Sequence, residues 1–442
     1  MKKLGFGLIG LVAIAVIYYL TAGSAQIMEN AKQQLNHELS VLQQSGFSVK
    51  ERKSKSKQDH FIISFDEPKK MTQYLKAKGT EMTLEDAKAL QGLQIGVDAK
   101  YLADSYSALS LDLYPVALPK SMLEDLGEED KKLIEHIKTM LKKKAFLVHI
   151  DFNKMLSGFK GYLKDINETI EDEGEKVTVA ATGMTFKGNI KEEKIHDFSQ
   201  KIGLISLDAG KELQAKITNI DGNYVMTGKT PYDITSRYHT EAIIVKAEPT
   251  LSFSVKDIDN ETKNTLHNGL LKSLITTKVK LVEIKEEQKK HTIKDIVLDF
   301  TVDNLDIGAL EALQKTDPED ETRIQQLTQQ ILSRGITLTL PEFSAKKIVD
   351  NGTEMRGFDM NGSIVIDKSF SMAAVSQNPF AVLEALHIKT HITISDELYA
   401  LTVQDPRAMI MMMMVPPATQ KNNKVYDISF SQGKLIVNGT SF

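Results

Sequence analysis

Two pairs of residues have types and spacings that could support catalysis or metal binding. His149 and Asp151 are two apart in a predicted strand, so both side chains project from one face and could form a proton-transfer dyad. No nucleophile motif accompanies them, and the same pattern is typical of ordinary surface residues. His387 and His391 are four apart in another predicted strand, where they would lie about 13 Å apart. That separation is too large for one metal ion, so we predict no metal site and no catalytic residue.

Other motifs that carry chemistry are also missing. The stretch Asp257–Glu261 is rich in oxygen ligands, but it lacks the glycine and the distal glutamate of a calcium loop. We interpret it as a turn from a strand into a helix, with Asp259 or Asn260 as the helix cap. There is no Gly-x-Ser-x-Gly nucleophile elbow and no His-Glu-x-x-His zinc motif. The chain has no cysteine, which excludes disulfides and thiolate chemistry. We therefore expect a protein that is not an enzyme and has no cofactor.

Five of the 17 methionines fall within six residues, just before Pro416 and Pro417. Methionine is flexible and polarizable, which suits irregular apolar contacts. The cluster could be a buried strand or helix turn, the lining of an apolar groove, or a surface that binds a partner. A copper(I) site is a further reading, since thioethers are soft ligands, but no histidine accompanies them. The members are Met409, Met411, Met412, Met413 and Met414.

The first residues predict delivery to a membrane. Residues 4–28 carry no charge, and residues 4–20 are almost wholly apolar, a length close to the roughly 20 residues that cross a bilayer. Lys2 and Lys3 would hold the N-terminus in the cytoplasm. The alternative is a secretory signal peptide cut near residues 23–25. We favour an anchor, with the body on the far side of the membrane from the cytoplasm. It is formed by Leu4, Phe6, Leu8, Ile9, Leu11, Val12, Ile14, Val16, Ile17, Tyr18, Tyr19 and Leu20.

The charge composition limits the kinds of partner that the chain beyond the apolar segment can bind. The chain has 442 residues, 41% hydrophobic and 26% charged, with a formal net charge of −4. Without Lys2 and Lys3, the 55 basic residues become 53 against 59 acidic ones, a net charge of −6. Nucleic-acid binding needs a basic face, so we expect no nucleic-acid partner. The basic stretch at residues 50–57 is the exception, and we interpret it as the tip of a hairpin.

A helix is predicted immediately after the apolar segment, over residues 26–45, with Gly46 ending it. Its apolar residues recur at spacings of three and four, which makes one apolar stripe. The stripe could form a short coiled coil and a homodimer, or it could pack on the protein's own sheet, which we favour. Its members are Met28, Ala31, Leu35, Leu39 and Leu42.

Strand patterns dominate from residue 175 onward, and many alternate apolar with polar residues, as antiparallel sheets with one wet face do. Helices are predicted over 261–274, 310–315 and 321–333. The acidic run at residues 168–176 is the best boundary. We predict an α+β fold with large, mostly antiparallel curved sheets covered by amphipathic helices, divided into 1–25 (anchor or signal), 26–175 (mixed) and 176–442 (β-rich).

Several stretches carry a family resemblance. Residues 298–313 place a strand before Asn-Leu-Asp and Ala-Leu-x-x-Leu, residues 336–343 read ITLTLPEF, residues 360–364 open a strand, and residues 433–439 close the chain. This order resembles the YdgA-like family of bacterial proteins, which has no assigned biochemical function. The resemblance implies one segment that crosses the bacterial inner membrane and a β-rich body in the periplasm. The strand-then-helix rhythm is also similar to AsmA-type envelope proteins, which implies lipid handling.

These observations favour a non-enzymatic envelope protein that holds or passes a lipid, or another hydrophobic molecule, in an apolar groove. The alternative is a structural or scaffolding protein that acts by homodimerisation or by binding a partner in the periplasm. Asn167 and Asn361 each sit in an acceptor pattern for bacterial N-glycosylation, with Asp two residues before and Thr or Ser two residues after. The pattern alone leaves open whether either is modified.

Overall fold

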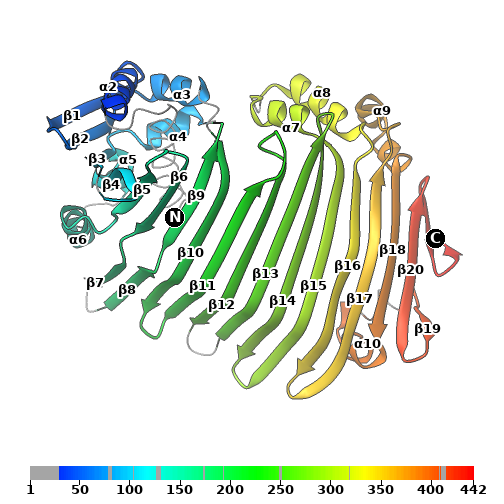
Figure 1. The fold of residues 1–442 in the computed structure, drawn as a ribbon. Helices are drawn as coiled ribbons and strands as arrows, with labels where there is room; N and C mark the ends of the chain where they lie inside the picture. The colour runs from blue at the N-terminus through cyan, green and yellow to red at the C-terminus, as the bar shows by residue number, and fades with distance from the viewer. Residues whose placement is uncertain are drawn as a thin grey trace. The chain divides into compact units, whose positions relative to one another are not determined.

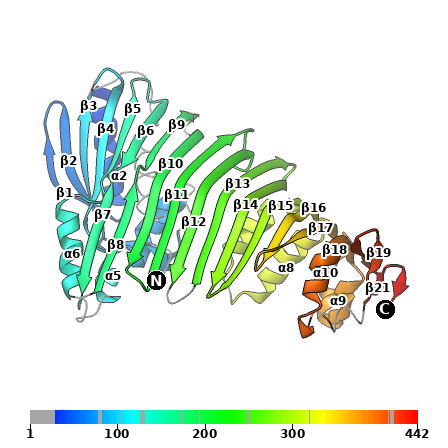
Figure 2. The ribbon, with the colours of Figure 1, turned by 90° about the horizontal axis from the view of Figure 1, so that it is seen from below.

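The computed structural model describes residues 29–77, 82–102, 104–125, 131–172, 175–192, 194–247, 251–317, 319–407, 409 and 415–442. Antiparallel strands make up most of this part of the chain, joined by short helices (Figures 1 and 2). The expectation of large antiparallel sheet is therefore confirmed. The predicted membrane anchor lies outside the described residues, and within them no helix is long and apolar enough to cross a membrane.

Residue contacts divide the chain into two compact units, one ending at Gly210 and the other running from Lys211 to Phe442. We call them unit 1 and unit 2. The acidic run that we interpreted as a boundary lies inside unit 1, on two strands that pair as a hairpin with Asp172 opposite Glu175. The described charges of this run therefore fall on β-strands rather than on a linker.

Unit 1 contains a strand meander whose later members pair out of sequence order. The pairing order is β1-β2-β3-β4-β5-β6-β9-β10, and β8 pairs with the second half of β10 and with β7. The strands are β1 (Phe47–Ser54), β2 (Gln58–Phe65), β3 (Gln94–Tyr101), β4 (Ser107–Ala117), β5 (Val148–Asn153), β6 (Gly158–Leu163), β7 (Ile166–Asp172), β8 (Glu175–Thr182), β9 (Thr185–Lys191) and β10 (Lys194–Ala209).

The helices of unit 1 close its apolar core. They are α2 (Glu29–Gln44), α3 (Pro68–Ala77), α4 (Leu84–Ala89), α5 (Lys120–Asp125) and α6 (Lys131–Lys142). Leu35 and Leu39 of α2 are buried against Phe61 and Val97 of the sheet. The prediction that this helix packs on its own sheet is therefore confirmed, and Gly46 follows it with φ +92°.

Unit 2 is a sequential meander in which each strand pairs with the next, from β11 to β18, and β20 then pairs with β18, β19 and β21. The strands are β11 (Leu213–Met226), β12 (Ile234–Ala247), β13 (Leu251–His267), β14 (Leu270–Glu286), β15 (Lys289–Asp306), β16 (Thr337–Asp350), β17 (Thr353–Ile366), β18 (Leu386–Ser395), β19 (Ala418–Gln420), β20 (Asn423–Ser431), β21 (Lys434–Val437) and β22 (Thr440–Ser441).

Short helices lie at the ends of these strands. Helices α7 (Ile307–Gln314) and α8 (Glu321–Leu332) connect β15 to β16 (Figure 1). Helix α9 (Met372–Gln377) and the 3₁₀ helix η2 (Pro379–Leu383) connect β17 to β18, and α10 (Asp396–Thr402) follows β18 at the opposite end of the strands. The predictions of helices at 310–315 and 321–333 are confirmed.

The predicted helix at 261–274 is wrong, because these residues form the end of β13 and the start of β14. Leu266, Leu270 and Leu274 are four apart, and this spacing imitated a helical stripe. The decisive signal is the dipeptide Asn268-Gly269, whose residues have φ +51° and +77°. Two consecutive positive φ angles are typical of the type I′ hairpin turn that Asn-Gly favours.

The interpretation of Asp257–Glu261 as a turn into a helix is wrong for the same reason. These residues continue β13, so neither Asp259 nor Asn260 caps a helix. Asp259 instead pairs with His239 Nδ1 on β12 at 2.8 Å, and Asn260 Nδ2 donates to Thr277 on β14 at 2.8 Å.

Candidate functional site

The strand register of unit 2 gathers apolar side chains into transverse rows. Residues that face each other across neighbouring strands share one face of the sheet. One row crosses seven strands and is wholly apolar: Ile217, Ile243, Val255, Val282, Ile293, Ile348 and Met355. The nearest row on the other side of the sheet midline is almost as apolar: Ile220, Thr240, Ile258, Val279, Ile296, Ala345, Phe358 and Ile394.

Between these two rows every strand carries one residue that pairs with no partner in the ladder. The row consists of Asn219, Glu241, Asp257, Lys280, Asp295, Lys346 and Gly357. Asn219, Asp257 and Asp295 have φ near +50°, a left-handed conformation that interrupts the alternation of a strand. Exposure changes phase there: in β11, residues 214 and 216 are exposed before the row, and 219, 221, 223 and 225 after it.

The phase shift keeps apolar side chains on one face. In strict alternation Ile217 and Ile220 would lie on opposite sides of β11, whereas the interrupted strand turns both to the same side. The same interruption lies between Val255 and Ile258 on β13 and between Val279 and Val282 on β14, so both members of each pair lie on one side of the sheet. We call the resulting surface of β11 to β18 the apolar face.

The apolar face is open over much of its extent. Both views show β11 to β15 as a single layer of strands (Figures 1 and 2). Most side chains of its two rows are half-buried, although Met355 and Ala345 are buried. The buried apolar clusters among the described residues lie in unit 1 and around α7 and α8. Polar residues interrupt the face on β13 and β14, where Asn260 and Thr277 are hydrogen-bonded at 2.8 Å.

Helices close two ends of this face. Leu305 and Leu338, at the ends of β15 and β16, pack against Ala309 of α7 and Leu327 of α8. At the other end, Tyr426 of β20 shares the face with Ile392 and lies beside α10. Burial, and then the neighbouring Tyr399 of α10, raises the pKa of Tyr426 to about 12.

The sheet that carries the apolar face is extensive. At about 4.8 Å between strands and about 3.3 Å per residue, the sheet from β11 to β18 measures about 35 Å by 45 Å. That corresponds to roughly 1,500 Å² of projected sheet area, in which polar positions such as Asn260 and Thr277 are included.

Comparison with known proteins yields no match among protein-family models, curated proteins or solved structures. The geometry and chemistry of the chain itself must therefore carry any functional conclusion.

Of the methionine cluster, only Met409 lies among the described residues. Met409 follows α10 and is 42% exposed, consistent with a surface position. Met411, Met412, Met413 and Met414 lie outside the described residues. The residues that form the apolar face were not singled out from the sequence, although the alternating strands that carry them were predicted.

The structure brings His149 and Asp151 together, as expected, and adds a third residue. His149 Nδ1 lies 2.6 Å from Asp112 on β4, and its Nε2 lies 3.3 Å from Asp151. Ser110 donates its hydroxyl to Asp151 at 2.5 Å rather than to the imidazole. A serine nucleophile needs its proton accepted by the histidine, so this arrangement does not activate Ser110.

Neighbouring strands of unit 1 carry a second polar cluster. Asp98 accepts from His60 Nδ1 at 2.6 Å and from Lys144 at 2.8 Å, and Lys144 Nζ lies 3.7 Å from the centre of the Tyr114 ring. Burial raises the pKa of Asp98, but the hydrogen bonds from Lys144 and His60 outweigh it and bring the pKa below its ordinary value. The cluster is internally satisfied, which is typical of a structural role.

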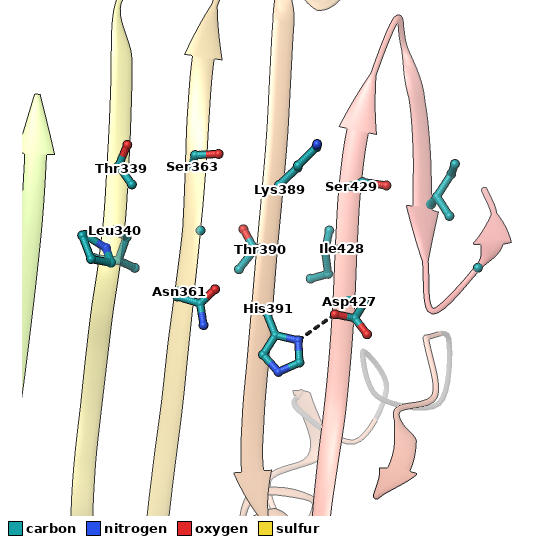
Figure 3. A pocket seen from close by; sticks show the side chains of 14 residues that line it. Thr339, Leu340, Asn361, Ser363, Lys389, Thr390, His391, Asp427, Ile428 and Ser429 are labelled. Carbon is teal, nitrogen blue, oxygen red and sulfur yellow. Dashed lines mark hydrogen bonds and ion pairs between the residues drawn. The ribbon is translucent and has the colours of Figure 1, made fainter. Parts of the chain in front are cut away.

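His387 and His391 lie on one face of β18, as predicted, but they have separate partners. His387 Nδ1 is 2.8 Å from Ser431. Figure 3 shows the second pair, in which His391 Nδ1 is 2.6 Å from Asp427. Among the described residues, no group of three His, Asp or Glu side chains could hold a metal ion. A shallow hollow of about 570 Å³ lies beside His391 on the polar side of the sheet, and Lys389 lines it.

Proposed function

We propose that this chain is a non-enzymatic protein of the bacterial envelope that holds the hydrocarbon part of a lipid against the apolar face of unit 2. The observation that carries the proposal is the open sheet surface on which two adjacent apolar rows run across seven strands. Open apolar surfaces of this size mark binding sites rather than ordinary solvent-facing sheet.

The chemistry of the face favours hydrocarbon over a peptide. Apart from the interrupted row, residues of β12 to β17 pair with strands on both sides, so the two apolar rows present side chains rather than free backbone groups. An acyl chain has no hydrogen-bonding groups that need partners, whereas a peptide laid on this surface would leave its own amides unsatisfied. The predicted anchor at residues 4–20 would keep the protein beside a source of lipid.

The scaffolding alternative has less support. It relied on the apolar stripe of the N-terminal helix, but Leu35 and Leu39 of α2 lie in the core of unit 1, 4% and 3% exposed. A homodimer would therefore need another surface.

A photoreactive amino acid tests the proposal in the full-length protein. Benzoylphenylalanine at Val255 would project from the apolar face, and at Ser254, one residue earlier on β13, from the polar face. We expect irradiation of living cells to produce lipid adducts at Val255, detected by mass spectrometry of the purified chain, and none at Ser254. This matched pair removes any contribution from lipid around the anchor.

Other outcomes would decide against lipid. Equal lipid adducts at both positions would mean non-specific contact with the membrane. Adducts between two copies of the chain at Val255 would favour the scaffolding alternative, with the apolar face as the dimer surface.

A further inference from the structure

The hairpin of β1 and β2 carries a dense run of positive charge at its closed end, where Ser54 pairs with Asp59. Five of the eight residues from 50 to 57 are basic and one is acidic, in a chain whose formal net charge is −4. All eight are exposed. We call residues 50–57 the basic tip, and its basic members are Lys50, Arg52, Lys53, Lys55 and Lys57.

Two of the basic side chains are engaged by the fold. Arg52 donates to Asn36 of α2 and lies 3.9 Å from Asp59, and Lys50 donates to Ser64 at 3.2 Å. The other three ammonium groups form no hydrogen bond or ion pair with any residue that the structure describes; they belong to Lys53, Lys55 and Lys57. These three side chains can therefore reach an outside partner without breaking a contact of unit 1.

Protection of the sheet edge accounts for only part of this charge. Charged residues on an end strand discourage the pairing of one molecule with another, and β1 is the first strand in the pairing order of unit 1. Lys53 on β1 fits that role. Lys55 and Lys57 lie in the connection between β1 and β2, so edge protection does not explain the charge of the turn.

The basic tip lies beside the beginning of α2 (Figure 1). Lys32 Nζ donates to the carbonyl oxygen of Lys55 at 2.6 Å. Lys32 follows Glu29, where α2 begins, by three residues, which corresponds to about 4.5 Å along the helix axis. The charge-free stretch that contains the predicted anchor ends at residue 28. An anchor there would bring the start of α2, and with it the basic tip, to the surface of the membrane.

We propose that the basic tip binds the phosphate headgroups of anionic lipids in the bilayer that holds the anchor. The inference depends on the predicted anchor, but not on the lipid proposed for the apolar face of unit 2. Each lysine close to an anionic bilayer strengthens binding roughly fivefold. The attraction acts within about 8 Å at physiological ionic strength, so only a tip held near the membrane benefits from it. Exposed lysines on a turn suit a fluid surface, because mobile headgroups gather around them and no preformed pocket is needed.

A single fluorescent label tests this contact in the full-length chain, which has no cysteine of its own. Ser56→Cys in the basic tip is labelled with bimane, and the chain is placed in phosphatidylcholine nanodiscs with or without phosphatidylglycerol. A trace of phosphatidylcholine with a nitroxide on its headgroup quenches the label on contact. We expect strong quenching in the anionic discs alone, and its loss at about 1 M salt, where the screening length is about 3 Å.

Charge variants identify the side chains that are responsible. Removal of all three free ammonium groups should lower the ratio of bound to free tips on the order of a hundredfold, through Lys53→Gln, Lys55→Gln and Lys57→Gln together. Arginine at the same three positions keeps the charge and should keep the quenching. The matched control removes three exposed lysines of unit 2 and should change nothing: Lys211→Gln, Lys246→Gln and Lys256→Gln.

The remaining outcomes would overturn the proposal. Equal quenching in both kinds of disc would mean contact without recognition of charge, and an equal loss in the two triple variants would mean that the basic tip has no special part. Absence of quenching in discs that hold the chain would exclude the contact while leaving the proposed function of unit 2 intact. A chain that stays outside the discs would refute the anchor and this inference together.

Discussion

Replacement of Val255 by glutamate tests whether the apolar face is open to water. Val255 lies in the middle of β13, between Ile243 and Val282, and it is half-buried. The substitution removes roughly half of the stabilisation that full burial of a valine provides, about 1 kcal/mol, while the new carboxylate stays hydrated. We therefore expect the free energy of unfolding of unit 2 to fall by about 1 kcal/mol.

The same substitution in a closed core should behave differently. Val97 of β3 is fully buried in the unit 1 cluster, with no exposed area. Val97→Glu places an unpaired carboxylate among apolar side chains, which costs about 3–5 kcal/mol or prevents folding. Ser254→Glu, on the polar face beside Val255, is the control for added charge, and because Ser254 lies opposite Glu283 its cost sets an upper limit for that effect.

Thermal unfolding followed by circular dichroism, at several protein concentrations and without added lipid, measures these differences. For a unit of this size, 1 kcal/mol corresponds to a change in Tm of about 2–4 °C. If Val255→Glu lowered the Tm as far as Val97→Glu, the apolar face would be covered in solution and the reasoning would fail. A Tm that rises with protein concentration would identify a second copy as the cover.

Two further substitutions test the elements that shape unit 2. Asp306 caps α7 by accepting from Ala309 N at 3.0 Å and also pairs with Arg334. Burial raises the pKa of Asp306, but hydrogen bonds from α7 and α8 outweigh it and bring the pKa below its ordinary value. The carboxylate therefore stabilises the fold above about pH 4, and this stabilisation is lost as the pH falls through the lowered pKa. Asp306→Asn should cost about 1 kcal/mol in urea unfolding at pH 7 and much less at pH 3; an equal cost at both would contradict the charge effect. At Gly357 a Cβ would lie 1.7 Å from the carbonyl oxygen of Ala345, so Gly357→Ala should cost about 3 kcal/mol or more. At Gly308 in α7 a Cβ would meet only Asp306 Oδ1, at an ordinary contact distance of 3.6 Å, so Gly308→Ala should stabilise the protein by about 0.5–1 kcal/mol. Similar Tm values for the two variants would contradict the close approach at Gly357.

Much of the fold follows from local patterns in the sequence. The alternation in β11 to β18 predicts antiparallel strands with one solvent-exposed face. Short turns between the strands make a sequential meander the simplest topology. The stripe of α2 and the N-terminal hairpin of unit 1 are confirmed as well. The prediction of a helix at 261–274 was wrong because the spacing of three leucines was given more weight than the Asn268-Gly269 dipeptide, which is typical of a hairpin turn.

The rest depends on which strands meet, and local pattern does not contain that information. The sequence places His149 and Asp151 on one face, but Asp112 joins them only through the pairing of β4 with β5. The opposition of Lys160 and Lys187 requires β6 to pair with β9 across two intervening strands. Local sequence patterns do not predict this register, because it arises from tertiary pairing.

The coordinated phase shift is what gives unit 2 one apolar face. A shift in one strand alone would turn its apolar residues to the polar side, because a displacement by one residue exchanges the two faces of a strand. Instead the shift occurs at one transverse row in seven consecutive strands, through left-handed residues at Asn219, Asp257 and Asp295 and through Gly357. Uninterrupted alternation would distribute the same apolar residues over both sides of the sheet. The matched interruptions keep the two apolar rows together, and the proposed binding of a hydrocarbon chain depends on this arrangement.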